Sequence, residues 1–230
     1  MKKDWDKTHF IQKLYDARDK ELATTMEAYM KNHFVFLGIK SPERLLLMKE
    51  YFSDYELPKY PEVLSEAMDV FLLPEREFQY AAIFIVSKYK KKLQVEDLSF
   101  FEQLILSKSW WDTVDSIAPT LVGDIVLRNR KIGEKVMGEW SNHSNKWLNR
   151  ASLLHMLKYK EKTDEALMTE LILKHAKSTE FFLQKAIGWL LREYSKTNPS
   201  FVQTFVSTYD LAPLSKREAV KHIEKDEQRN

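Results

Sequence analysis

The chain has 230 residues, no cysteine and a formal net charge of +2, from 36 Lys and Arg against 34 Asp and Glu. A chain of this length can bury a core without disulfides or metals, and the lack of cysteine excludes thiol catalysis, thiolate metal sites and disulfides. The 5 Gly and 7 Pro leave little material for hairpin turns and favour helices.

The first ten residues, MKKDWDKTHF, lack the apolar core of a signal peptide. No apolar run in the chain approaches the roughly 18 residues of a membrane span. We therefore expect a cytoplasmic protein without a membrane partner.

Apolar residues recur at helical spacing in a series of segments separated by short loops. In chain order these are residues 41–52, 60–73, 75–89, 145–159, 164–176 and 179–194. There is no convincing alternating strand pattern and no Gly-rich phosphate loop. Helix pairs recurring about every 35 to 45 residues predict an all-α fold, a HEAT-like repeat α-solenoid with a concave face. No linker divides the chain, which predicts a single domain over residues 1–230.

Charge is distributed unevenly, with −3 over residues 1–115 and +5 over residues 116–230. A basic bias in the second half permits nucleic-acid binding. Variation between two solvated surfaces explains it equally well.

The stretch SWWDTVDSIA, residues 109–118, places two tryptophans beside two acids. Ser109 and Asp112 have the spacing of a capping box, which predicts a helix from about Trp110. Asp115 lies one turn past Trp111 on the same helix face. Its carboxylate could oppose a positive charge in a ligand or transition state, or pair with Arg150. Packing alone is a third explanation for the two tryptophans.

Arg150 falls inside the apolar sector of segment 145–159. A desolvated guanidinium requires a carboxylate, backbone carbonyls or a bound anion. The sequence leaves a structural ion pair and an anion site as alternatives.

Segment 179–194 carries an aromatic ring away from its core stripe. Trp189 projects to the side opposite the apolar stripe, near Phe182, Lys185 and Arg192. Cations beside an aromatic face are typical of a nucleic-acid surface. Packing against the next helical repeat is the alternative.

Other chemical sites have little support. The six histidines form no close ligand pair, so we expect no metal site. No Ser, His and acid form a nucleophile motif.

Taken together, the chain resembles the AlkD-type DNA alkylation-repair glycosylases, which are built of HEAT-like repeats. The resemblance is carried by six segments in family order: YMKNHFVFLGIKSPER (29–44), REFQYAAI (76–83), SWWDTVDSIA (109–118), NKWLNRASLL (145–154), FFLQKAIGWLLREYSKTNP (181–199) and LSKREAVKHI (214–223).

The resemblance implies removal of cationic N3- and N7-alkylated purines from duplex DNA by hydrolysis of the N-glycosidic bond. Asp115 would be the carboxylate that stabilises the oxocarbenium-like sugar, and Trp111 and Trp189 its aromatic walls. Arg150 would contact a DNA phosphate near the lesion, and Tyr29 would line the same concave, DNA-binding face. Lys185 and Arg192 are further DNA-binding candidates.

The same resemblance implies a monofunctional glycosylase without a metal or nucleotide cofactor, and no lysine is placed for Schiff-base chemistry. The expected partner is duplex DNA containing alkylated bases, and nothing in the sequence demands more than a monomer.

Two departures from the family keep other functions open. Many members carry paired arginines where this chain has Arg44-Leu45 and Asn149-Arg150, which removes a cation at each place. The alternatives are a non-catalytic DNA-structure binder on the same scaffold and a solenoid that binds a peptide.

Overall fold

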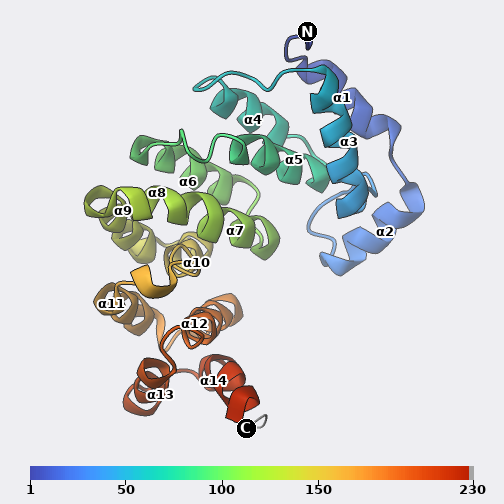
Figure 1. Cartoon of the computed structure of the whole chain (residues 1–230). Helices are drawn as coiled ribbons and strands as arrows, with labels where there is room; N and C mark the ends of the chain where they lie inside the picture. The colour runs from blue at the N-terminus through green and yellow to red at the C-terminus, as the bar shows by residue number, and fades with distance from the viewer. Residues whose placement is uncertain (228–230) are drawn as a thin grey trace. The chain divides into compact units, whose positions relative to one another are not determined.

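The computed structural model describes residues 1–227, and its regular structure is helical (Figure 1). Among those residues the only β-type pairing is an isolated bridge between Lys3 and Tyr55. No described helix has both the length and the apolar character needed to cross a membrane. The predicted all-α fold class is confirmed.

The chain forms two compact units, Met1–Lys92 and Leu93–Asn230. Each has its own helices and its own buried apolar core. That residues 1–230 work as a single domain stays a prediction.

The N-terminal unit contains five α-helices, of which α4 packs against α5 and α1 packs against α3 and α4. Asp6 and Asp19 cap α1 and α2 by accepting hydrogen bonds from backbone N–H groups of the first turn. The helices are α1 (Lys7–Asp16), α2 (Lys20–Tyr29), α3 (Ser41–Asp54), α4 (Val63–Phe71) and α5 (Arg76–Ser87).

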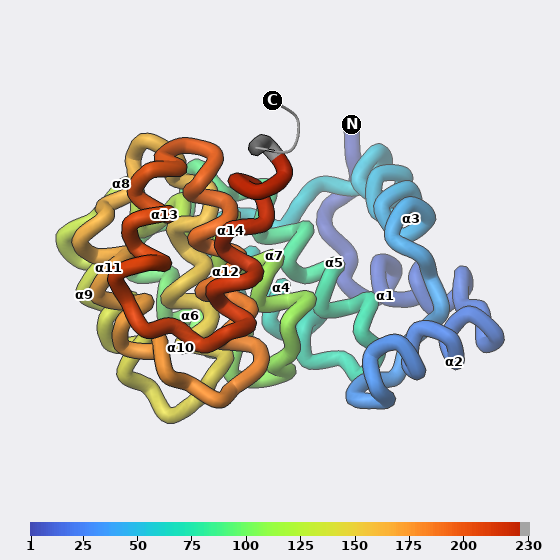
Figure 2. Tube along the Cα trace, turned by 90° about the horizontal axis from the view of Figure 1, so that it is seen from below, coloured from blue at the N-terminus to red at the C-terminus, as the bar shows by residue number. Residues whose placement is uncertain are grey.

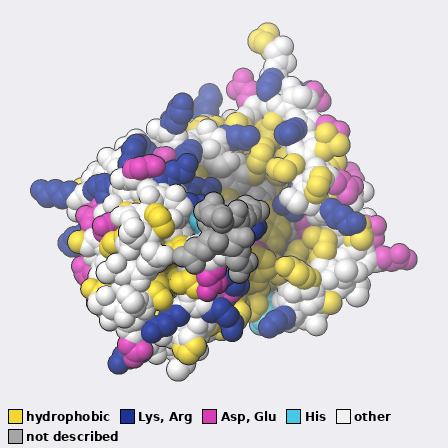
Figure 3. Space-filling view, turned by 60° about the horizontal axis from the view of Figure 1, so that its bottom comes forward, with side chains coloured by type: hydrophobic (Ala, Val, Ile, Leu, Met, Phe, Trp, Pro, Cys, Tyr) yellow, Lys and Arg dark blue, Asp and Glu magenta, His cyan; other side chains and the backbone are white. Residues whose placement is uncertain are grey.

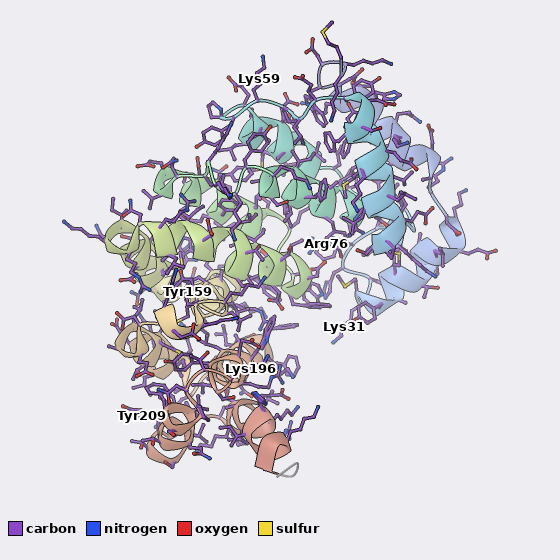
Figure 4. The ribbon with its side chains drawn as sticks, viewed as in Figure 1. Lys31, Lys59, Arg76, Tyr159, Lys196 and Tyr209 are labelled. Atoms are coloured by element: carbon purple, nitrogen blue, oxygen red, sulfur yellow. The ribbon has the colours of Figure 1, made fainter. Side chains whose placement is uncertain are left out.

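Two charged residues at the start of α5 are completely buried. The carboxylate of Glu77 accepts hydrogen bonds from the backbone N–H groups of Leu37, Gly38 and Ile39, at 2.9 to 3.0 Å. The guanidinium of Arg76, labelled in Figure 4, lies 3.8 Å from the centre of the Phe34 ring. These contacts fix the loop between α2 and α3, because the buried carboxylate satisfies three donors that water cannot reach.

The C-terminal unit continues with short and long helices to the end of the described chain. They are η1 (Val95–Asp97), α6 (Leu98–Ser107), α7 (Trp111–Ile117), η2 (Ala118–Val122), α8 (Gly123–Arg128), α9 (Arg130–Asn142), α10 (Lys146–Leu154), η3 (Lys160–Lys162), α11 (Glu165–His175), α12 (Phe181–Tyr194), α13 (Pro199–Thr208) and α14 (Pro213–Glu227).

Helix pairs stack in this second unit. Each of the pairs α9–α10, α11–α12 and α13–α14 is in contact, α10 packs against α12, and α12 packs against α14 (Figure 2). Asn145, Asp164 and Asn198 cap α10, α11 and α13. This stacking of successive pairs is the arrangement predicted for HEAT-like repeats.

The turn after α10 contains a buried histidine and a buried tyrosine that form hydrogen bonds to backbone carbonyls. His155 is completely buried, and its Nδ1 lies 2.6 Å from the carbonyl oxygen of Ser152. The hydroxyl of Tyr159, labelled in Figure 4, donates a 2.7 Å hydrogen bond to the carbonyl of Gly123. The rings of His155 and Tyr159 meet edge to face. The Tyr159 hydroxyl connects this turn to Gly123, the first residue of α8.

Candidate active site

A pocket of about 430 Å³ opens on the C-terminal unit, among α7, α10, α12 and α14. Its volume lies within the range of small-ligand sites. It is lined by Trp111, Asp115, Arg150, Phe181, Phe182, Lys185, Trp189, Arg192 and Glu218. The sequence-predicted residues Asp115, Trp111, Trp189, Arg150, Lys185 and Arg192 are therefore brought together in one place.

Helix α7 begins at Trp111, close to the predicted start, but the predicted capping box is wrong. Trp110 is the N-cap residue, and α7 has no side-chain capping hydrogen bond. The Ser109 hydroxyl donates instead to the carbonyl of Ile105, in the last turn of α6. A carbonyl at a helix C-terminus has no partner within its helix, so Ser109 ends α6 and does not start α7. Asp112 remains an acid in the first turn of α7, where the helix dipole favours it.

The two tryptophans of SWWDTVDSIA have different surroundings. Trp110 packs against Trp147 and Phe182, with ring centres 5.5 and 5.3 Å away. Trp111 is half-buried and lines the pocket. Packing, one of the explanations offered for the two tryptophans, therefore applies to Trp110, whereas Trp111 lines the pocket.

The helix that carries Asp115 changes its geometry three residues after it, where α7 ends at Ile117 and the next segment begins at Ala118. The segment Ala118–Val122 is a π-helical turn containing Pro119. Proline has no N–H, so Pro119 cannot donate the α-helical hydrogen bond to the carbonyl of Asp115, four residues earlier. Such single π turns are found frequently at functional sites.

Asp115 and Arg150 form a two-pronged ion pair across the pocket wall. Nε of Arg150 donates to Oδ1 of Asp115 at 2.7 Å, and Nη2 donates to Oδ2 at 2.8 Å. Nη1 of Arg150 donates to the carbonyl of Phe182 on α12. Arg150 is only 4% exposed, so this pair connects α7, α10 and α12 in a largely dry environment. Arg150 thus has two kinds of partner that the sequence analysis considered, a carboxylate and a backbone carbonyl.

Burial raises the pKa of Asp115 above its ordinary value. The hydrogen bonds and the charge of Arg150 oppose this rise, and the neighbouring charge of Asp112 adds to it. The pocket thus holds a carboxylate whose ionised form is desolvated, which is the condition under which it attracts a nearby cation most strongly.

Trp189 lies on the pocket side of α12, where it is half-buried. The two cations predicted beside it, Lys185 and Arg192, also line the pocket, and both contact the carboxylate of Glu218 on α14, at 3.1 and 2.9 Å. Sequence reasoning missed Glu218. Glu218 shares the buried face of α14 with Ser215 and Ala219, but the sequence alone does not identify that face, because α14 is rich in charged residues.

Phe181 is a second lining residue that the sequence did not single out. Its side chain is largely exposed at the start of α12, and its ring meets Phe182 edge to face at 5.3 Å between centres. Large exposed aromatic rings at a pocket mouth are available for contact with a ligand.

Tyr29 belongs to the other unit. It is the last residue of α2, and its side chain is 74% exposed. Its place on the same DNA-binding face as Asp115 stays a prediction.

The two positions that depart from the family differ in their surroundings. Asn149 is buried, and its Nδ2 donates to the carbonyls of Trp140, Ser141 and His143 at the end of α9. Leu45, on α3, is partly exposed beside the buried Arg44, which lies 4.4 Å from the centre of the Tyr80 ring.

The lining residues combine two largely buried carboxylates, Asp115 and Glu218, with two indole rings and the cations of Lys185 and Arg192. Among the side chains that the structure describes, residues 1–225, no group of three or more His, Asp or Glu is arranged to hold a metal ion. On the face shown in Figure 3, Lys and Arg are interspersed with Asp and Glu instead of forming one basic field. The site is suited to a ligand that is cationic where it meets Asp115 and anionic where it meets the rim.

Comparison with known proteins gives consistent matches. The sequence model of the family described as DNA alkylation repair enzyme matches residues 10–223. A solved structure described as a predicted DNA alkylation repair enzyme from Enterococcus faecalis is 34% identical, with a TM-score of 0.83 over 90% of this chain and 97% of that chain. No curated protein matches the chain.

Proposed function

Because this chain belongs to the DNA alkylation repair enzyme family, we propose that it is a monofunctional DNA glycosylase that excises cationic N3- and N7-alkylated purines. The observation that carries the proposal is Asp115, a desolvated carboxylate that lines a pocket together with Trp111 and Trp189. The fold and the family support a role in DNA alkylation repair.

The chemistry begins with the lesion itself. An alkylated purine of this class carries a positive charge, so its bond to C1′ of the sugar breaks with the electron pair moving to the base. The base leaves neutral, and the positive charge appears on the sugar as an oxocarbenium-like ion. Water then attacks C1′ and loses a proton. The protein has no need to protonate the leaving group, and its main task is to stabilise the charge on the sugar.

Asp115 is suited to that task although it is paired with Arg150. Each carboxylate oxygen can accept two hydrogen bonds, and Arg150 uses one position on each. The remaining lone pairs belong to a side chain that lines the pocket. Arg150 then acts as a positioning residue, because two parallel hydrogen bonds fix the plane of the carboxylate.

Trp111 and Trp189 supply electron-rich faces to the same pocket. An aromatic face attracts a cation, and the attraction is greater where water is excluded. The alkylated base is cationic before cleavage, and the sugar is cationic during cleavage, so the two rings attract both. Stabilisation that grows as charge develops on the sugar accelerates the reaction, whereas equal binding of both states does not.

The rim of the pocket accounts for binding of the DNA backbone. Lys185 and Arg192 are partly exposed, and we assign them to phosphate contacts. We further propose that Arg150 contacts a phosphate and that Tyr29 contacts the DNA. The protein acts as a monomer in the cytoplasm. The partner is duplex DNA that contains alkylated bases.

The direct experiment is incubation of the protein with methylated duplex DNA, followed by separation of free bases from DNA. We expect release of 3-methyladenine or 7-methylguanine, formation of abasic sites without strand cleavage, and no release from unmethylated duplex. Salt-dependent DNA binding with no base release would refute the proposal and support the non-catalytic DNA-binding alternative, which the missing arginines at Leu45 and Asn149 favour. Absence of duplex binding at low salt would favour a peptide-binding solenoid.

A further inference from the structure

Glu218 lies where α14 packs closely against Gly188 of α12. A Cβ atom added to Gly188 on α12 would lie 2.4 Å from Cβ of Glu218 and 3.0 Å from the carbonyl oxygen of Ser215. The Ser215 hydroxyl also donates a 3.0 Å hydrogen bond to the carbonyl of Gln184. The absent side chain of Gly188 therefore lets α14 bring its glutamate against the pocket-facing side of α12.

Three cations converge on this single carboxylate. Nζ of Lys185 lies 3.1 Å from Oε1 of Glu218, and Nζ of Lys221 lies 2.6 Å from the same oxygen. Nη1 of Arg192 donates to Oε2 at 2.9 Å. The side chain of Glu218 is only 6% exposed, whereas the three cations are each between about a third and a half exposed. The carboxylate is the buried centre, and the cations form the accessible shell.

The cluster carries an excess of positive charge. Burial acts to raise the pKa of Glu218, but the hydrogen bonds and charges of Lys221 and Lys185 outweigh it and lower that pKa to about 2. Glu218 is thus ionised at neutral pH and offsets one of the three cations. Each cation retains N–H donors beyond the one that contacts Glu218, so the shell can bind a further anion.

The position of the cluster relates it to the pocket. Lys185, Arg192 and Glu218 line the same pocket as Asp115 and Trp189. Lysine and arginine side chains lose conformational entropy when they are ordered by a ligand. A carboxylate that orders them before binding removes part of that cost.

We propose that Glu218 is a positioning residue, which holds Lys185, Arg192 and Lys221 as a preformed phosphate-binding cluster at the rim of the pocket. Glu218 itself does not contact DNA. The inference rests on the proposed function for the identity of the anion, a DNA phosphate, and assigns Lys221 to the DNA contact as well.

The test is binding of duplex DNA by Glu218→Gln, because two explanations predict opposite results. If only net charge matters, loss of a negative charge beside the DNA tightens binding. If Glu218 positions the cations, binding weakens although the protein has become more positive. We expect about tenfold weaker binding at low salt, since several long side chains lose their prearranged positions, and partial recovery in Glu218→Asp.

Glu139→Gln is the matched control, because Glu139 is an exposed glutamate on α9 and does not line the pocket. It makes the same change in net charge and should bind DNA at least as tightly as the unmodified protein. Binding by Glu218→Gln that equals or exceeds binding by Glu139→Gln would overturn the inference. Thermal unfolding of both variants reports whether they fold.

Lys221→Gln tests the cluster even if Glu218→Gln does not fold. Lys221 is partly exposed. The slope of log affinity against log salt concentration is negative, and loss of Lys221 should decrease its magnitude by about 0.9. Lys135→Gln on α9 should leave the slope unchanged. An unchanged slope in Lys221→Gln overturns the inference.

Base release separates this inference from the proposed function. In Glu218→Gln, the half-saturating concentration of methylated DNA should rise by a larger factor than the rate constant of release at saturation falls, whereas Glu139→Gln should change neither quantity. If the protein binds DNA through the cluster but releases no base, the proposed glycosylase function is contradicted, while the inference about Glu218 still holds.

Discussion

Both oxygens of Asp115 accept hydrogen bonds from Arg150, at 2.7 Å from Nε and 2.8 Å from Nη2. Two residues that the sequence placed 35 positions apart thus form one unit on the pocket wall. The ion pair explains how a carboxylate and a guanidinium are both kept among aromatic side chains, and it leads to the first two predictions.

Removal of Arg150 should destabilise the protein. In Arg150→Met, Asp115 keeps its buried position without its charge partner, and we expect a loss of about 3 kcal/mol in the free energy of unfolding. The double variant Arg150→Met, Asp115→Leu no longer contains the uncompensated charge. Its loss in the free energy of unfolding should be clearly smaller than the sum of the losses in the two single variants. Urea unfolding at pH 7 measures this coupling. Additive losses would show that the pair is not a unit.

The rate of base release should fall in acid because Asp115 must be ionised to oppose the charge on the sugar. Burial raises the pKa of Asp115, so the acid limb of the pH profile should lie above the ordinary aspartate value of about 4. Release is full above that limb and is lost as pH falls through it. Circular dichroism at each pH controls for unfolding. An acid limb below about pH 4 would contradict the raised pKa.

Stability should also decrease in acid because of His155, a separate buried group. Burial lowers the pKa of His155 to about 4, against about 6.5 in an unfolded chain. Between these values the unfolded state binds the extra proton, so stability is fully present above pH 6.5 and is lost as pH falls towards 4, by about 3 kcal/mol.

The measurement is the melting temperature across that pH range, compared with His155→Phe. The variant should lose this part of the pH dependence, whereas His143→Gln, at an exposed position on the same unit, should keep it. Identical pH dependence in His155→Phe and the unmodified protein would show that His155 is not the group responsible.

Gly188 should tolerate no side chain. Gly188→Ala places Cβ within 2.4 Å of Glu218, and we expect a loss of about 1–3 kcal/mol in stability as α12 and α14 move apart. Gly138, also inside a helix, has nothing within 4 Å of an added Cβ. Gly138→Ala should therefore stabilise by about 0.5–1 kcal/mol. Thermal unfolding of the two variants should give shifts of opposite sign, and equal shifts would contradict the close packing of α12 on α14.

The sequence predicted α10 and α12, two of the four helices that line the pocket, because helical periodicity is strong in both. It did not resolve α7 and α8 in detail. Helix α7 begins without a side-chain cap, and a π turn at Ala118–Val122 follows it. The spacing of apolar residues does not predict either feature. Ser109 illustrates the ambiguity, since a serine between two helices can serve the end of one or the start of the next.

The site was predictable where a residue conflicted with its own helix. Arg150 in an apolar sector and Trp189 away from the core stripe were such conflicts, and both line the pocket. Their partners were not predictable, because pairing of Arg150 with Asp115, or of Lys185 and Arg192 with Glu218, depends on how separate helices pack. Helical spacing within one segment contains no such information.

The most direct test of the proposed function is the single-turnover rate of methylated-base release from duplex DNA by the unmodified protein and by Asp115→Asn, with DNA binding measured in parallel. Asparagine keeps the shape of the side chain and removes its charge. We predict that the unmodified protein releases 3-methyladenine or 7-methylguanine, and that Asp115→Asn binds the same DNA but releases base at least about 100-fold more slowly, as expected when electrostatic stabilisation of a transition state is removed. Equal rates of release by the two proteins would contradict the role of Asp115, and no release by either would contradict the glycosylase itself.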